Sequence, residues 1–297
     1  MIANLHPSPH KPARVVVLGA GGFIGGAVAR ALRSQGIEVA GLTRDSCDLL
    51  ASDAAARLAA ELRTDDTLVF VSARAPVKNV PMLMENIRMG EAVCAALQTR
   101  PVAHLVYISS DAVYKDSAEP LSESSCAEPG SLHGVMHLTR EVMLRNEFPR
   151  PLALVRPTLT YGINDPHNGY GPNRFRRLAA EGKEVVLFGE GEERRDHVAV
   201  NDIAELVRHI VLHRSTGIAN AVSGEVVSFR ALAEFIATQF APAVAIQGSP
   251  RTGPMPHDGL RPFKPSAALA AFPGFKFTSW REGLAAMCAE TQTAGAR

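Results

Sequence analysis

Three regularly spaced glycines are the first residues of the chain whose types suggest a chemical role. Gly19, Gly22 and Gly25 follow an apolar run at 14–18, which predicts a strand buried on both faces, and they open a predicted helix. Glycines in such a turn let backbone N–H groups approach a pyrophosphate at the positive helix N-terminus. The motif therefore predicts a dinucleotide cofactor. The alternative is a glycine-rich turn that holds no ligand.

The end of the second predicted strand bears on which dinucleotide is bound. An acidic side chain there would hydrogen-bond the ribose 2′-OH of NAD, whereas an arginine accommodates the 2′-phosphate of NADP. In this chain the strand is followed by Arg44, with Asp45 beside it. We predict NADP, with NAD as the alternative, because Arg44 could also be merely exposed or stack on the adenine of NAD.

The elements that must position these residues follow from an alternation of apolar runs and helical stretches. Strands are predicted at 14–18, 38–42, 67–71, 103–109 and 151–155, and helices at 23–34, 53–62, 82–98 and 133–146. This alternation predicts βαβ units, and therefore an α/β fold with a Rossmann-type doubly wound parallel sheet. The first dozen residues carry three prolines and predict a loose tail.

The pattern changes after residue 156, where a loop at 161–172 and a proline-rich connector at 249–265 interrupt shorter elements. A helix at 201–213 and a strand at 218–222 are expected to return to the first sheet. We therefore predict a Rossmann dinucleotide-binding domain made of residues 12–166 and 199–223. A smaller C-terminal substrate lobe is predicted from residues 167–198 and 224–297.

Composition excludes several classes of function. The 297 residues carry 31 basic and 30 acidic side chains, so nothing indicates a nucleic-acid or membrane surface. No apolar stretch is long enough to span a bilayer, and no signal peptide is recognisable. Four dispersed cysteines lack metal-type spacing, so no metal site is expected, and they fit a reducing compartment. The predicted location is the cytoplasm.

The glycine spacing, with Phe23 and Ile24 inside it, resembles that of the extended short-chain dehydrogenase/reductase superfamily, which includes nucleotide-sugar epimerases and dehydratases. Further segments resemble the superfamily in the correct order along nearly the whole chain. Asn86 stands where the family has a structural asparagine. The resemblance implies further cofactor contacts at Asp48 and Leu49, at Ala73, Arg74 and Ala75, and at Ser109, Pro157 and Thr158.

The chain departs from the family in the catalytic motif. The family carries Tyr-x-x-x-Lys, in which the tyrosine exchanges a proton with the substrate while the lysine binds ribose and lowers the tyrosine pKa. His133 and His137 stand at these positions. Both fall on one helix face, and histidine can act as an acid or base near neutral pH. We interpret His133 as the proton-exchanging residue and His137 as the ribose-binding one. The alternatives are a protein that has lost the chemistry, or a histidine engineered in place of tyrosine.

Other matches concern the substrate. Ser110 resembles the residue that hydrogen-bonds the reacting sugar, and Asp111 stands where dehydratases and some 4-keto reductases carry a proton donor. A helix-capping or turn-capping aspartate is the alternative for Asp111. Arg195 resembles an arginine that clamps the nucleotide diphosphate, with Asn173 and Arg174 as partners. The alternatives are a local salt bridge for Arg195 and an exposed helix start for the other two.

Together the resemblance implies an NAD(P)-dependent nucleotide-sugar epimerase or 4-keto reductase that transfers hydride at sugar C4. A catalytically inactive, cofactor-binding sensor or scaffold is the rival interpretation, because the catalytic motif is altered. Family members often form homodimers through the two helices predicted here at 82–98 and 133–146. The expected partners are therefore a nucleotide-sugar substrate and a second copy of the chain.

Overall fold

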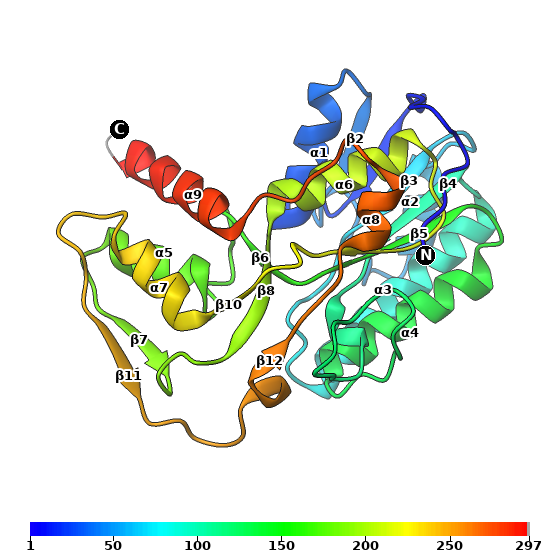
Figure 1. Ribbon diagram of the computed structural model, residues 1–297. Coiled ribbons are helices and arrows are strands. Elements are labelled where there is room, and N and C mark those ends of the chain that lie inside the picture. Colours follow the sequence, from blue (N-terminus) through cyan, green and yellow to red (C-terminus); the bar gives the residue numbers. More distant parts are fainter. Residues whose placement is uncertain (296–297) are drawn as a thin grey trace.

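The six strands predicted for the first domain form one parallel sheet in the computed structural model, which describes residues 1–295. In sheet order they are β2 (Val39–Leu42), β1 (Val15–Leu18), β3 (Thr67–Phe70), β4 (His104–Ile108), β5 (Leu152–Pro157) and β9 (Gly217–Ala221). Every residue of β1, β3, β4 and β5 is buried, as expected for strands covered on both faces. The predicted Rossmann-type α/β fold is confirmed (Figure 1).

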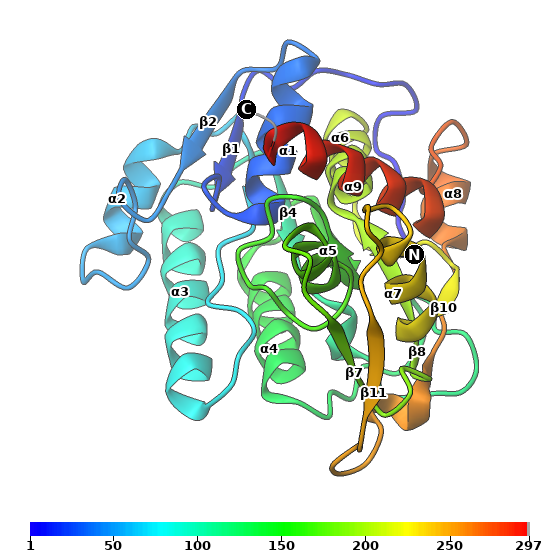
Figure 2. The same cartoon turned by 90° about the vertical axis from the view of Figure 1, so that its left-hand side faces the viewer.

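Helices cover both faces of this sheet (Figures 1 and 2). On one face lie α1 (Phe23–Ser34) and α6 (Val200–Leu212); on the other lie α2 (Ala54–Glu61), α3 (Val80–Thr99) and α4 (Leu132–Glu147). The strand order reverses between β1 and β3, so the ligand crevice is expected at the carboxyl ends of these two strands. Gly19 and Ser72 follow them, and a Cβ on Gly19 would lie only 2.9 Å from the Ser72 nitrogen.

A smaller lobe is built around a second sheet. In it β8 (Arg194–Ala199) pairs with β6 (Leu159–Tyr161), β10 (Val226–Ser228) and β12 (Leu260–Arg261). The lobe also contains the pair β7 (Val185–Phe188) and β11 (Ile246–Ser249), with the helices α5 (Pro172–Ala180), α7 (Phe229–Ala237) and α9 (Trp280–Gly295). Figure 1 shows these elements on one side of the molecule and the large sheet on the other.

Two segments pack differently from the predicted division. The strand β6 pairs with β8 of the small lobe, whereas the sequence predicts residues 159–161 within the Rossmann domain. Conversely, α8 (Ser266–Ala271), Phe272 and Phe275 pack into the core of the large sheet beside α6. Their apolar side chains are removed from water by packing against the apolar face of the sheet next to α6. No helix in residues 1–295 combines the length and hydropathy needed to cross a membrane.

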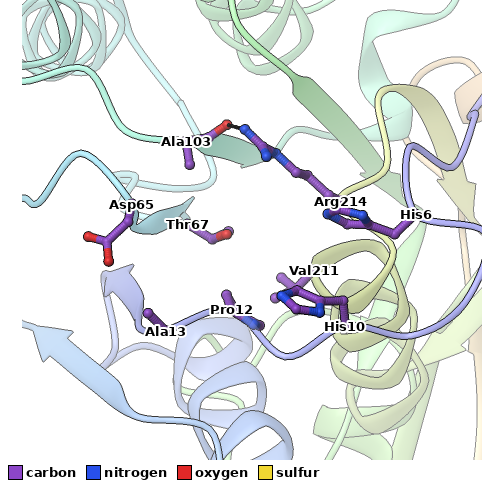
Figure 3. Close-up of a pocket in the computed structure, with 9 residues that line it drawn as sticks. All are labelled: His6, His10, Pro12, Ala13, Asp65, Thr67, Ala103, Val211 and Arg214. Carbon is purple, nitrogen blue, oxygen red and sulfur yellow. Dashed lines mark hydrogen bonds between the residues drawn. The ribbon is translucent and has the colours of Figure 1, made fainter.

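The prediction of a loose N-terminal tail is wrong. Ala3 and Thr216 exchange two backbone hydrogen bonds of 2.8 Å, and the backbone N–H groups of His6 and His10 donate to carbonyls at the end of α6. Between the tail, α6 and the starts of β1, β3 and β4 lies a pocket of about 320 Å³ (Figure 3). Because it opens at the amino ends of the strands, it lies opposite the glycine turn and is separate from the dinucleotide crevice.

Candidate active site

In the glycine turn between β1 and α1, backbone segments come so close together that no side chain fits between them. Gly19 has a φ of 100°, which favours glycine, and a Cβ on Gly25 would lie 2.1 Å from the carbonyl oxygen of Gly19. Gly22 is the exposed N-cap of α1, with no side chain capping the helix and no acidic residue in the first turn. Free backbone N–H groups at a positive helix end fit a pyrophosphate. The turn thus fits the predicted dinucleotide.

Arg44 lies just beyond β2 with its side chain 77% exposed. Its Nε is 3.6 Å from a carboxylate oxygen of Asp48, a contact too long and too exposed to hold it firmly. Asp48 accepts a hydrogen bond of 3.0 Å from the backbone N–H of Leu50, and Leu49 is buried. Arg44 is therefore free to meet a charged group on the cofactor, whereas the neighbouring turn is fixed.

The segment after β3 is held by Asn86, which is fully buried in α3. The side-chain oxygen of Asn86 accepts a hydrogen bond of 2.9 Å from the backbone N–H of Arg74, and its amide nitrogen donates to the Arg74 carbonyl at 3.0 Å. The Arg140 guanidinium donates to the same side-chain oxygen at 3.2 Å. These bonds fix the backbone of Arg74, which lies between Ala73 and Ala75, and they give Asn86 a structural role.

A buried ion pair fastens α4 to the ends of β4 and β5. The carboxylate of Glu141 accepts hydrogen bonds from the Ser109 hydroxyl at 2.6 Å and from Nε of Arg156 at 2.8 Å. Thr158, which follows Pro157, donates its hydroxyl to buried Asp196 at 3.0 Å. The hydroxyls of Ser109 and Thr158 are therefore used within the protein. A cofactor contact at either hydroxyl oxygen would therefore have to be one in which that oxygen accepts a hydrogen bond.

His133 and His137 lie in the first turns of α4 with their rings edge to face, 4.7 Å between centroids. Burial lowers the pKa of His133 below its usual value near 6.5, although the nearby Asp111 carboxylate opposes this effect. Burial lowers the pKa of His137 further, and the neighbouring His133 and Arg140 add to the effect. Both imidazoles are therefore neutral near pH 7. Nδ1 of His133 is buried and has no hydrogen-bond partner among residues 1–295.

The start of α4 packs directly on the turn that follows β4. A Cβ on Gly134 would lie 2.0 Å from the carbonyl oxygen of Ala112, so only glycine permits this approach. That turn is the short helix η1 (Asp111–Val113), and Ser110 is its N-cap: the Ser110 hydroxyl accepts from the Ala112 N–H at 3.1 Å. The fold thus brings the Ser110–Asp111 turn against the start of α4, where the Asp111 charge acts on His133.

A residue that sequence reasoning missed holds Asp111. Arg261, in β12, is 1% exposed, and its Nε donates to the Asp111 carboxylate at 3.1 Å while Nη2 donates to the Asp111 carbonyl at 2.8 Å. The proline-rich connector around Arg261 carries no motif that marks it. An ion-paired carboxylate is suited to fixing the turn and poorly suited to donating a proton. Ser110 and not Asp111 caps η1, and the Asp111 carboxylate instead has a structural partner in Arg261.

The residues predicted for the diphosphate separate into two groups. Arg195 has a side chain 11% exposed; it pairs with Glu193 at 3.2 Å and lies 4.0 Å from the Asp111 carboxylate, next to the active-site turn. Asn173 is buried, and its side chain is hydrogen-bonded to the backbone at 160 and 162. Arg174 is exposed on α5. The structure therefore brings Arg195 to the site, and it gives Asn173 a local structural role.

A parallel sheet with a glycine turn at its switch point, and a helix carrying paired polar residues beside the β4 end, defines a Rossmann-type protein of the short-chain dehydrogenase/reductase kind. Residues 15–222 match the NAD dependent epimerase/dehydratase family model. The chain belongs to that family.

Relatives support this placement. One relative is a rice protein (Oryza sativa subsp. japonica) provisionally named GDP-L-fucose synthase 2. It is 31% identical over 255 residues, which are 76% of this chain and 72% of that protein. The UDP-glucose 4-epimerase of Thermus thermophilus, solved with NAD, superposes with a TM-score of 0.83 at 23% identity, over 95% of this chain and 99% of that one. RMD from Pseudomonas aeruginosa, solved with NADPH, gives 0.82 at 20% identity, over 95% and 99%.

Proposed function

We propose that the protein is an NAD(P)-dependent nucleotide-sugar epimerase or 4-keto reductase in which His133 takes the place of the usual tyrosine. The observation that carries the proposal is the contact of His133 with His137 at the start of α4, packed against the Ser110–Asp111 turn. A relative named as a GDP-L-fucose synthase and a similarly folded UDP-glucose 4-epimerase support a nucleotide sugar as the substrate.

The uncapped start of α1 would bind the pyrophosphate of the cofactor, and exposed Arg44 would meet the 2′-phosphate of NADP. Structures of this fold hold NAD in one case and NADPH in another, so the preference for NADP rests on Arg44 alone. The bound cofactor supplies or accepts the hydride at sugar C4.

The chain itself moves the proton. Neutral His133 accepts the proton of the sugar hydroxyl in the oxidative direction and returns it in the reductive direction. The Ser110 hydroxyl orients the same sugar oxygen, and His137 donates a hydrogen bond to a ribose hydroxyl. Arg195 binds the diphosphate of the substrate, for which a guanidinium is geometrically suited.

The exposed face of α3 and α4 is proposed as the contact surface of a homodimer. A groove of about 830 Å³ runs along the two helices, which lie side by side in Figure 2. Val135 and Val142 line it and are 37% and 56% exposed, so a second copy would remove apolar side chains from water.

Isotope transfer separates the enzyme from a cofactor-binding sensor or scaffold. NADPH carrying deuterium at nicotinamide C4 is incubated with 4-keto nucleotide sugars, and deuterium in the sugar is measured by mass spectrometry. We expect transfer by the native protein and none by His133→Phe. Cofactor binding with no transfer to or from any nucleotide sugar would instead support the inactive protein.

A further inference from the structure

A buried tyrosine connects the histidine pair to the sheet. Tyr107 lies in β4 and has no exposed surface, and its hydroxyl oxygen is 2.8 Å from Nδ1 of His137. The rings of Tyr107 and His137 are also neighbours, with centroids 5.9 Å apart. Because His137 in turn meets His133 edge to face, the three side chains form a continuous row from the sheet toward the active-site turn.

The phenol is the donor in this hydrogen bond. Burial raises the pKa of Tyr107 to about 12, so the phenol keeps its proton at neutral pH. A buried hydroxyl hydrogen needs an acceptor. The neighbouring Arg140 offers only N–H groups, and Glu141 is already paired with an arginine and a serine. Within residues 1–295, Nδ1 of His137 is the acceptor that Tyr107 reaches.

We propose that Tyr107 is a positioning residue that fixes the tautomer of His137. Since Nδ1 accepts the phenol proton, the neutral imidazole carries its own proton on Nε2. His137 therefore presents an uncharged N–H donor at a defined place, which suits the oxygen of a ribose hydroxyl. The tautomer itself follows from the contacts, whereas the role of its N–H rests on the proposed function.

Without the phenol, Nδ1 of His137 would be buried with no partner, which is unfavourable. The ring is then expected to flip or to change tautomer, and the Nε2–H donor loses its fixed place. Tyr114 provides a matched control, because it is also buried and its hydroxyl donates to the Asn220 side chain at 2.7 Å instead of to a histidine.

The test is long-range ¹H–¹⁵N correlation NMR on the full chain labelled at histidine, with the His137 signal assigned from its loss in His137→Gln. We expect the neutral Nε2–H pattern for His137 in the native protein and in Tyr114→Phe. In Tyr107→Phe we expect a mixed or Nδ1–H pattern. Calorimetry should also show the Kd for NADP(H) rising about fivefold in Tyr107→Phe, as for one lost hydrogen bond.

A native spectrum with the Nδ1–H or the charged pattern would overturn the proposal, as would an unchanged His137 pattern in Tyr107→Phe. The native spectrum decides the tautomer even if Tyr107→Phe does not fold. The spectra need neither cofactor nor substrate, so this result is separate from the proposed function: a confirmed tautomer without any hydride transfer removes only the proposed reaction.

Discussion

We expect the two histidines of α4 to take the positions of the family's tyrosine and lysine, and the charge of the lysine gives a physical reason why both residues would change together. A nearby cation lowers the pKa of an acid, which helps a tyrosine whose usual pKa is near 10. The same cation beside His133 would further depress a pKa that burial already lowers, leaving a weaker base. A neutral imidazole at 137 keeps a hydrogen-bond donor without that charge.

His133→Phe is expected to abolish hydride transfer while leaving cofactor binding intact. In the native protein the neutral base form is lost as pH falls through the lowered pKa of His133. Activity should therefore fall only in acid and persist through mildly alkaline pH, as a pH–rate profile would reveal. Normal turnover by His133→Phe would assign the base to another residue, with Asp111 the next candidate.

Arg44→Ala is expected to narrow a preference for NADP(H) over NAD(H) by about tenfold, as for one lost charge-assisted contact. Calorimetry with both nucleotides measures the preference. Arg57→Ala is the matched control, because Arg57 is also an exposed arginine in an i,i+4 pair with an aspartate but lies on α2. Equal affinities for the two cofactors in the native protein would contradict the prediction.

For single residues, the sequence predicts which side chains share a helix face, but it does not predict which distant side chains pack against them. The positions of His133 and His137 on one helix face follow from their four-residue spacing, and the rings are in contact. The environment of Asp111 could not be predicted, because its partner Arg261 lies 150 residues away in a segment without periodicity. The contact of Tyr107 with His137 could not be predicted either, because a tyrosine within an apolar strand resembles an ordinary core residue.

Among the elements, the strand–turn–helix unit of β1 and α1 depends on one contact. A Cβ on Gly25 would lie 2.1 Å from the Gly19 carbonyl oxygen. Because this oxygen belongs to the backbone, it can move away only if the turn itself is distorted. Gly25→Ala is therefore expected to lower the free energy of unfolding by about 3 kcal/mol and to weaken cofactor binding. Urea unfolding measures the loss.

Gly26→Ala is the control for this prediction. The added Cβ would lie 3.4 Å from its nearest neighbours, an ordinary contact, and alanine favours a helix interior by up to about 1 kcal/mol. Gly26→Ala should therefore be neutral or stabilising. Equal stabilities for the two variants would show that the turn adjusts and that close packing at Gly25 is unimportant.

The long helices and the buried strands of the large sheet were predictable within a few residues because each shows a clear period or a continuous apolar run. The strands β6, β10 and β12 have only three, three and two residues, too few to show alternation. Their pairing with β8 is decided by distant contacts. The tail was mispredicted because local proline content says nothing about backbone partners at the end of α6.

On the scale of the whole molecule, Val142→Arg is expected to convert a dimer into a monomer, because a charge would be buried in the proposed α3–α4 contact. Sedimentation velocity measures the change. Leu269→Arg, at an exposed apolar residue on α8, should leave the assembly state unchanged. A native protein that sediments as a monomer at micromolar concentration would refute this assignment of the surface.

The return of residues 266–277 to the large sheet also bears on how the chain folds as it is made. Phe272 and Phe275 complete the core beside α6, and the Asn4 side chain donates to the carbonyl of Ala271 at 3.0 Å. Domains made of continuous chain can fold while synthesis proceeds. Here the core of the large sheet is complete only once residues 268–275 have been made, long after β9. A fragment ending at residue 222 should accordingly be cut by protease far faster than the full chain.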